Sequence, residues 1–174
     1  MDISHFSMLD LFRVEAEAAA SLDHPCIVPI YEIGECAGAC YFSMKFVEGG
    51  QLDEVVEREP ISIRRSIELV AKLARTVHYA HENGVLHRDI KPGNILLEAS
   101  GEPMVADFGL AHRVEGDSRN KLSSAVVGSP SYMAPEQATG GAHAVTTAAD
   151  IYSVGAILYE LLCGRPPFLA ATPL

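Results

Sequence analysis

The chain has 174 residues, enough for one domain or for part of a larger one. Its 13 basic and 23 acidic residues give a formal net charge of −10, which argues against non-specific binding to nucleic acid or to an anionic membrane surface. Hydrophobic residues make up 48% of the chain, enough to build a buried core.

The sequence shows no signal for export or membrane insertion. The first ten residues lack the basic segment followed by an apolar one that marks a signal peptide. The longest apolar stretch, IYSVGAILYELLCG, contains Glu160 and is too short to span a bilayer, so it predicts a buried helix. The four cysteines have no zinc-site spacing and predict reduced thiols. We therefore expect a cytoplasmic chain with no membrane segment.

The N-terminal part predicts a helix followed by a hairpin. Residues 9–22 carry apolar side chains at helical spacing, and a His-Pro pair ends the run; the expected face consists of Leu11, Val14, Ala18 and Leu22. Residues 27–35 and 39–50 are strand-like runs joined by a turn that contains glycine and cysteine. The second run stops at a pair of glycines.

Residues 62–82 predict the clearest helix of the chain. Ser62 is the expected N-cap, and Asn83-Gly84 is a strong C-terminal signal. The expected apolar face consists of Ile67, Val70, Ala71, Ala74, Val77 and His78.

The C-terminal part predicts two short strands, a long loop and a last helix. Residues 95–98 and 104–106 read as strands around a Ser-Gly turn. Residues 107–145 are rich in small residues and predict a long loop with little regular structure, which in a compact domain is usually functional. A helix is expected from Thr147, the start of a pattern resembling a capping box, to about Cys163, with a glycine and two prolines after it.

Four motifs carry the chemistry. VLHRDIKPGNILL (85–97) alone is compatible with a solvated polar turn or with a site that handles phosphate. It is followed by ADFGLA (106–111), MAPEQA (133–138) and DIYSVGAILYELL (150–162). Each pattern is weak by itself, but this set in this order resembles the catalytic domain of a eukaryotic-type Ser/Thr protein kinase, of the kind also found in bacteria.

The resemblance covers about residues 11–169 and implies an α+β fold of two lobes. Residues 1–10 stay unassigned. Residues 11–47 would form a partial N-lobe, with two strands and the long helix. Residues 48–174 would form a partial, mainly helical C-lobe with the catalytic loop, an activation segment at 107–136 and a central helix.

The resemblance also assigns catalytic roles, which suit the residue types. Asp89 would orient or accept the proton of the attacking hydroxyl, and Lys91 would hold the γ-phosphate of ATP as a point charge. A lysine at this position resembles Ser/Thr kinases more than tyrosine kinases. Asn94 and Asp107 offer the hard oxygen ligands that Mg²⁺ prefers, and the family places them on the metal ions. Taken singly, they read as a turn residue and a helix cap.

The nucleotide side follows by position in the resemblance. Met44 matches the gatekeeper, and Lys45 and Val47 match the hinge residues whose backbone groups meet the adenine. Leu96 would lie under the ring and Gln51 near the ribose. Without the resemblance, the apolar residues of this set read equally well as ordinary core.

The resemblance further implies internal supports. His87 and Phe108 would stack with Ile30 and Ala19 into a spine that aligns the lobes. Glu15 matches the ion-pairing glutamate of the N-lobe helix; its competitor Glu17 would point about 200° away around the helix.

Regulation is implied at the activation segment. Arg88 would pair with a phosphate on that loop, for which Ser123 and Ser124 are the candidate acceptors, with Ser123 fitting the spacing better. Ser129 stands where the family has a hydroxyl that contacts the catalytic aspartate and lysine. The family further pairs Glu136 with a later arginine, in the helices after residue 169 that this sequence lacks. Asp150 would cap its own helix, brace the backbone of the catalytic loop, or do both.

The family pattern is incomplete in this sequence. It contains no Gly-rich loop, no strand lysine of the V-A-I-K type and none of the helices that usually follow residue 169. We therefore expect a chain truncated at both ends, by a start codon inside a longer gene or as a gene fragment. The helix at 151–162 should then expose apolar side chains and lower the solubility.

The resulting expectation is a Ser/Thr protein kinase core segment that transfers the γ-phosphate of Mg-ATP to protein Ser or Thr hydroxyls. The alternatives are an inactive kinase-like piece serving as an interaction module and a small-molecule phosphotransferase. The ADFG and APE elements and the long serine-bearing loop disfavour the last. ATP and a protein substrate are the expected partners, with Mg²⁺ as cofactor and no nucleic acid.

Overall fold

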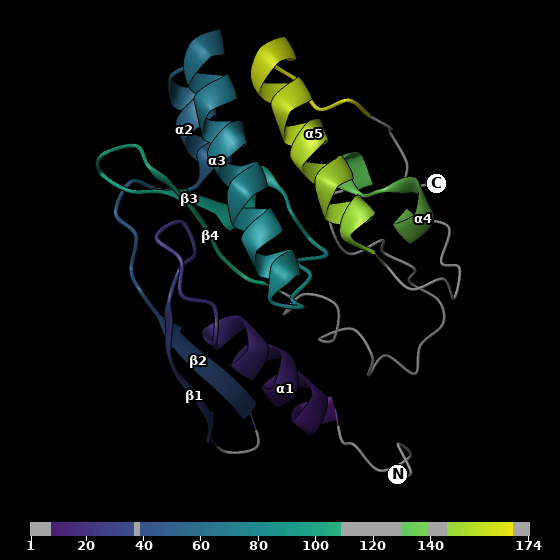
Figure 1. The fold of residues 1–174 in the computed structure, drawn as a ribbon. Helices are drawn as coiled ribbons and strands as arrows, with labels where there is room; N and C mark the ends of the chain where they lie inside the picture. The colour runs from purple at the N-terminus through teal and green to yellow at the C-terminus, as the bar shows by residue number, and fades with distance from the viewer. Residues whose placement is uncertain (1–7, 37–38, 109–129, 139–145, 169–174) are drawn as a thin grey trace.

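The computed structural model describes residues 8–36, 39–108, 130–138 and 146–168 (Figure 1). Its helices are α1 (Met8–Ala20), α2 (Leu52–Arg58), α3 (Ile63–Glu82), α4 (Pro135–Ala138) and α5 (Thr147–Cys163). Its strands are β1 (Ile30–Cys36), β2 (Ala39–Met44), β3 (Ile95–Leu97) and β4 (Pro103–Val105). Short 3₁₀ turns cover Pro92–Asn94 and Pro130–Tyr132. The expected α+β class is confirmed.

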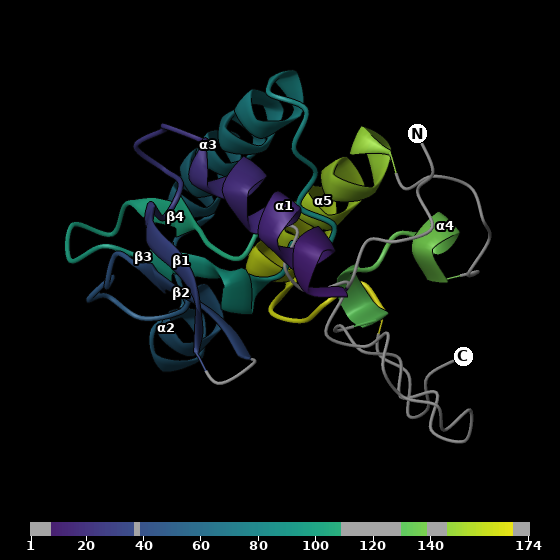
Figure 2. The same ribbon diagram turned by 90° about the horizontal axis from the view of Figure 1, so that it is seen from below.

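The strands form two antiparallel hairpins, β1–β2 and β3–β4, and the helices pack around them. Helix α1 lies beside the β1–β2 hairpin at one end of the molecule, and α3 packs along α5 at the other (Figure 1, Figure 2). The β3–β4 hairpin lies between these two parts (Figure 1). One buried cluster runs through both parts, from Ala19 and Leu22 through Leu69, Leu73 and Phe108 to Ile157. The parts therefore share a core.

Helix α3 has the predicted ends but buries a different face. Ser62 is the N-cap, with its hydroxyl accepting from the Arg65 N–H, and Asn83 is the C-cap. The buried face consists of Ser66, Leu69, Val70, Leu73, Thr76, Val77 and Ala80. The predicted face was wrong at Ile67, which is 53% exposed, and at Ala74 and His78, which are also exposed.

The observed face also includes two buried hydroxyls. Ser66 and Thr76 donate to the carbonyls of Ser62 and Lys72 one turn earlier, at 3.1 and 2.9 Å. Since these hydroxyls are satisfied inside the helix, they can be buried at little cost. A pattern drawn from apolar residues alone misses them.

The N-terminal elements differ from the prediction in their ends and in one face. Helix α1 ends at Ala20, and it buries Ala16 and Ala19 while Val14 is 55% exposed. In this alanine-rich run, the small side chains rather than the β-branched one face the core.

The second strand was predicted too long. Strand β2 ends at Met44, because the following backbone bonds elsewhere: the Lys45 N–H donates to the Pro29 carbonyl and the Gly49 N–H to the Leu97 carbonyl. Helix α2 comes soon after and was not predicted.

Helix α5 starts with a different cap from the expected one. The N-cap is Thr146, whose hydroxyl accepts from the Ala148 N–H at 3.3 Å, so Thr147 is the first helical residue. The predicted end is confirmed, since Gly164 caps the helix with a left-handed backbone, φ 70°. The loop expected over 107–145 contains a 3₁₀ turn and α4 within residues 130–138, so it has more regular structure there than predicted.

Candidate active site

The loop between α3 and β3 fixes the carboxylate of Asp89. Lys91 Nζ lies 2.7 Å from Asp89 Oδ2, and Asn94 Nδ2 donates to the same oxygen at 3.3 Å and to the Asp89 carbonyl at 2.8 Å. Pro92 opens the 3₁₀ turn in which the Asn94 N–H donates to the Lys91 carbonyl. The turn therefore brings together the three predicted catalytic residues, and Oδ1 of Asp89 takes part in none of these contacts.

Asp150 of α5 supports this loop. Its side chain is 1% exposed and accepts hydrogen bonds from the backbone N–H groups of His87 and Arg88, at 2.9 and 2.8 Å. It also lies 2.8 Å from Nε2 of His81 on α3. The carboxylate thus braces the catalytic-loop backbone, while the helix cap belongs to Thr146. His81 was not among the predicted site residues. The only feature of the sequence that marks it is its position as a histidine in the last turn of α3.

His87 connects the loop to the strand that precedes Asp107. Its Nε2 lies 2.9 Å from the Ala106 carbonyl, and its Nδ1 lies 3.3 Å from the Asp89 N–H. These partners require a proton on Nε2 and none on Nδ1, which is the neutral ring, and burial lowers the pKa of His87 in agreement. The ring also contacts Phe108, with centroids 4.8 Å apart.

Two hydrogen bonds to the backbone of Ala106 fix the position of the next residue, Asp107. Besides accepting from His87, Ala106 donates its N–H to the Asn94 carbonyl at 2.9 Å. Asp107 follows directly with φ 60°, and Arg88 beside Asp89 has φ 69°. Left-handed backbone at non-glycine residues is strained and tends to occur at functional sites. The two motifs that carry the predicted site therefore meet through backbone hydrogen bonds.

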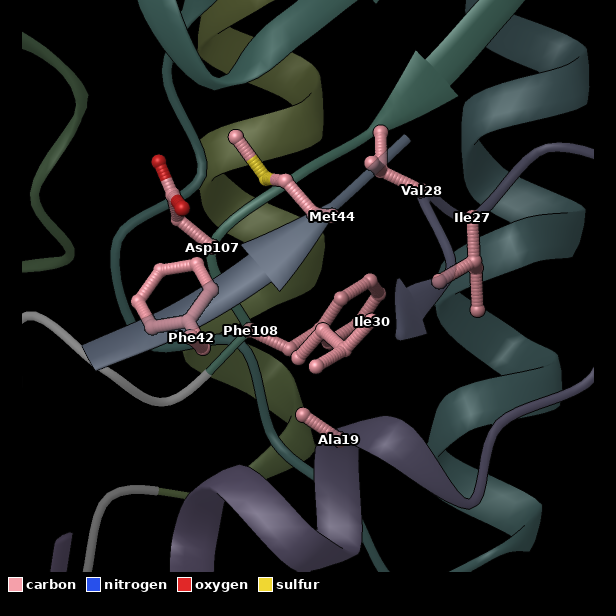
Figure 3. Close-up of a pocket in the computed structure, with 8 residues that line it drawn as sticks. All are labelled: Ala19, Ile27, Val28, Ile30, Phe42, Met44, Asp107 and Phe108. Atoms are coloured by element: carbon pink, nitrogen blue, oxygen red, sulfur yellow. The ribbon is translucent and has the colours of Figure 1, made fainter. Parts of the chain in front are cut away.

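Asp107 lies at the edge of a small apolar cavity between β2, α1 and Phe108. The cavity has a volume of about 10 Å³, room for about one water, and Ala19, Ile30 and Met44 line it as well (Figure 3). Phe108 packs near Ile30 and Ala19, and the carboxylate of Asp107 extends away from Phe108 (Figure 3). The other three residues of the expected spine, Ala19, Ile30 and His87, thus lie around Phe108.

The residues present fit a magnesium ion. Asn94 uses its amide nitrogen on Asp89, which leaves its carbonyl oxygen outside those contacts. The carboxylate of Asp107 offers a second oxygen of the hard kind that Mg²⁺ prefers. Among the described residues no group of three or more His, Cys, Asp or Glu side chains could hold a metal. Mg²⁺ does not need one, because it is usually held by one or two carboxylates together with phosphates and water.

Part of the predicted adenine site comes together as a second apolar cluster. Val47 is buried with Val28, Met104 and Ala106, and Leu96 packs against them. The Lys45 N–H donates to the Pro29 carbonyl. The Lys45 side chain extends to Glu98, with Nζ 2.7 Å from Oε1. The remaining two predicted residues lie at cavities: Met44 at the small one with Asp107, and Gln51 at a larger one beside the catalytic loop.

Glu15 points to the catalytic loop. Its Oε1 lies 3.1 Å from Nη1 of Arg88, whereas Glu17 pairs with Arg13 on the exposed side of α1. Glu15 thus lies toward the catalytic loop and Glu17 on the exposed side, and the expected role of Glu15 as the family's ion-pairing glutamate stays a prediction. Nε of Arg88 is buried and has no hydrogen-bond partner among the described residues.

The remaining predicted residues lie in or near the segment before α5. Ser123, Ser124 and Ser129 lie outside the described residues, and Glu136 has an exposed side chain on α4. Its neighbour Gln137 was missed by the sequence analysis: Nε2 donates to the Arg88 carbonyl at 2.9 Å. No local pattern marks such a contact.

The geometry agrees with comparisons to known proteins. A family model described as "Protein kinase domain" matches residues 4–173. The chain belongs to the protein kinase domain family. It is 41% identical over 169 residues to the serine/threonine-protein kinase PknB of Mycobacterium tuberculosis (strain H37Rv), covering 93% of this chain and 26% of the relative. It is 42% identical over 158 residues to the serine/threonine-protein kinase PrkC of Bacillus subtilis, covering 90% of this chain and 24% of the relative.

These relatives support a bacterial-type Ser/Thr kinase domain segment. The PknB of Mycobacterium leprae gives the same result, with 38% identity over 167 residues. The kinase chain spans about a quarter of the length of the curated relatives that it matches. Within the residues that the structure describes, no helix is both long and apolar enough to cross a membrane.

Proposed function

We propose that this kinase segment transfers the γ-phosphate of Mg-ATP to Ser or Thr hydroxyls of a protein. The proposal rests on the position of the Asp89 carboxylate. Lys91 and Asn94 hold it on a loop that is hydrogen-bonded to Ala106, the residue before Asp107. Phosphoryl transfer depends on such positioning and on charge neutralisation more than on covalent chemistry.

Each residue of the loop has a definite task in this reaction. The acceptor hydroxyl donates its proton toward Oδ1 of Asp89 while its oxygen bonds to the γ-phosphorus and the bond to ADP breaks. Lys91, close to Asp89, is placed to contact the transferred group as a cation. Asn94 and Asp107 would hold Mg²⁺, which when bound neutralises negative charge on the phosphates.

The adenine would lie on the apolar cluster of Val47 and Leu96. The carbonyl of Lys45 and the N–H of Val47 are the proposed hinge contacts, with Met44 as gatekeeper and Gln51 near the ribose. Nothing in this cluster is charged, which suits a flat, largely apolar base.

We also assign regulation to Arg88. It joins Asp89 to α1 through Glu15, and its buried Nε lacks a partner among the described residues. A phosphate on Ser123 or Ser124 would supply acceptors for this guanidinium. Such a phosphate would couple the activation segment to the catalytic loop. In the same proposal, Ser129 contacts the catalytic pair.

Transfer of labelled γ-phosphate from Mg-ATP to a generic basic protein tests the function. Asp89→Asn should lower the rate by about 10²–10⁴-fold, because a positioned general base contributes that much. Asp107→Ala should lower transfer and also weaken binding of Mg-ATP, whereas Asp89→Asn should leave that binding nearly unchanged.

Asp23→Asn is the matched control, because it removes an exposed carboxylate away from the site. Circular dichroism spectra check that all samples are equally folded. A folded wild-type chain that is as inactive as both variants, and that does not bind Mg-ATP, would contradict the proposal in favour of an inactive kinase-like module.

A further inference from the structure

Gln137 of α4 uses both ends of its side-chain amide to join two segments that lie far apart in the chain. Its Nε2 donates to the Arg88 carbonyl of the catalytic loop at 2.9 Å, and its Oε1 accepts from the Ala134 N–H at the start of α4 at 3.1 Å. These partners fix the orientation of the amide, because a carbonyl needs a donor and an N–H needs an acceptor. Gln137 is therefore a bridge between the catalytic loop and the segment before α5.

The bridge ends on the peptide group that leads into Asp89. The Arg88 carbonyl and the Asp89 N–H belong to one planar peptide. Gln137 holds the oxygen of this peptide, and Nδ1 of His87 lies 3.3 Å from its nitrogen. Among the described residues, no other group donates to the Arg88 carbonyl. Gln137 therefore helps to set the orientation of the peptide next to which the Asp89 side chain extends.

The other end of the bridge lies on a fixed base. Ala134 is fully buried, and the 3₁₀ turn before it is bonded to α5, because the Ser153 hydroxyl donates to the Tyr132 carbonyl at 2.8 Å. Helix α5 also carries Asp150, which accepts from the Arg88 N–H. The catalytic loop is thus tied to α5 twice, directly through Asp150 and indirectly through Gln137.

Both bridged segments border the same cavity. Lys91 of the catalytic loop and Tyr132 of the 3₁₀ turn line it, and Asp89 lies 2.7 Å from Lys91. The bridge therefore fixes how these two lining residues lie relative to each other, next to the carboxylate that an acceptor hydroxyl would approach.

Helix capping alone would not require the bond to Arg88. A glutamine three residues after the N-cap, as Gln137 is after Ala134, can accept from the N–H of the cap residue in any helix. That role uses Oε1 only. The Nε2 donor is the part of Gln137 that serves the catalytic loop, and a glutamate would lack it.

We propose that Gln137 is a positioning residue for phosphoryl transfer, which holds the Arg88–Asp89 peptide in register with α4 and so sets where Asp89 meets the acceptor hydroxyl. The inference rests on the proposed kinase function and adds a residue to it. Lys91 and Asn94 fix the carboxylate only relative to its own loop. Since small displacements of a reacting group lower the rate strongly, the loop itself also needs a fixed position.

Two substitutions separate the two ends of the amide. Gln137→Glu keeps an acceptor for the Ala134 N–H and loses the donor to Arg88, whereas Gln137→Lys keeps a donor and loses the acceptor. Hydrogen exchange of the Arg88 and Asp89 amides, measured by NMR, should be about tenfold faster in Gln137→Glu, as expected for the loss of one hydrogen bond. Gln137→Lys should exchange at nearly the wild-type rate there. If Gln137 only capped α4, neither substitution would change exchange in the loop.

Turnover of the same samples tests the consequence for catalysis. Gln137→Glu should lower kcat by about tenfold and leave the affinity for Mg-ATP within about twofold of the wild type. Gln137→Lys should recover most of kcat, which a capping role would not allow. Ala138→Glu is the matched control, because it adds the same charge at an exposed position of the same helix, and it should change neither exchange nor turnover.

Two results would overturn the inference: loop exchange in Gln137→Glu that equals the wild type, or an unchanged kcat in that variant beside an active wild type. Failure of the proposed function looks different. In that case the wild type transfers no phosphate while exchange still separates Gln137→Glu from Gln137→Lys, so the bridge holds the loop and the kinase function is wrong.

Discussion

Asp150 shows how a single buried carboxylate orders the candidate site. It accepts from two consecutive backbone N–H groups of the catalytic loop and lies against His81, so α3, α5 and the loop meet at one side chain. At this point Arg88 adopts a left-handed backbone. The carboxylate offsets that strain with two charge-assisted hydrogen bonds.

Asp150→Ala should therefore destabilise the chain by about 3 kcal/mol, because it leaves two buried N–H groups without acceptors. The measurement is the free energy of unfolding in urea. Asp23→Ala, which removes an exposed carboxylate, should change it by less than about 0.5 kcal/mol. A loss below about 1 kcal/mol for Asp150→Ala would mean that water or other groups replace these contacts.

At the scale of elements, α3 illustrates the difference between where a helix lies in the sequence and which side it buries. Its ends follow from Ser62 and Asn83, which are local signals. Its buried face depends on α5 and on β4, which pack against it. Leu73 is fully buried there, whereas Ile67 is 53% exposed.

Truncation of the two side chains should reflect this difference. Leu73→Ala should lower the free energy of unfolding by about 3 kcal/mol, because it removes buried methyl groups and leaves a cavity. Ile67→Ala, a similar loss of volume on the same helix, should cost less than about 0.5 kcal/mol. Chemical denaturation measures both, and the reverse order would mean that the helix is rotated in solution.

At the scale of the whole molecule, one face of α5 carries apolar side chains outside the shared core. Ile151, Tyr159 and Leu162 are 63%, 38% and 44% exposed, and their spacing places them on the same side of the helix. The exposure expected for this helix from the sequence is confirmed, while its effect on solubility stays a prediction. Exposed contiguous apolar surface of this kind favours association.

The native chain should therefore bind a hydrophobic dye and self-associate. Replacing Ile151 and Leu162 together by glutamine should reduce the dye fluorescence and the mass measured by light scattering, with little change in the free energy of unfolding. Tyr31→Gln, a change at an exposed aromatic residue of β1, serves as the control. Dye binding that is absent in the wild type would refute the prediction.

The sequence by itself determined the family, the order of the motifs and the ends of α3 and α5. These features depend on residues close together in the chain: the caps Ser62 and Gly164, the turn at residues 100–101, and the fixed spacing within VLHRDIKPGNILL. Backbone preferences and local hydrogen bonds act over a few residues, so a linear pattern is sufficient to identify them.

Only the tertiary structure decided which groups meet. Separate segments meet in the pairing of Glu15 with Arg88, in the contacts of His81 and of the catalytic-loop backbone with Asp150, and in the contact of Gln137 with that loop. The buried face of α3 belongs to the same class, since α5 and β4 pack against it. Each depends on packing between distant parts of the chain, and no local pattern of residues encodes that packing.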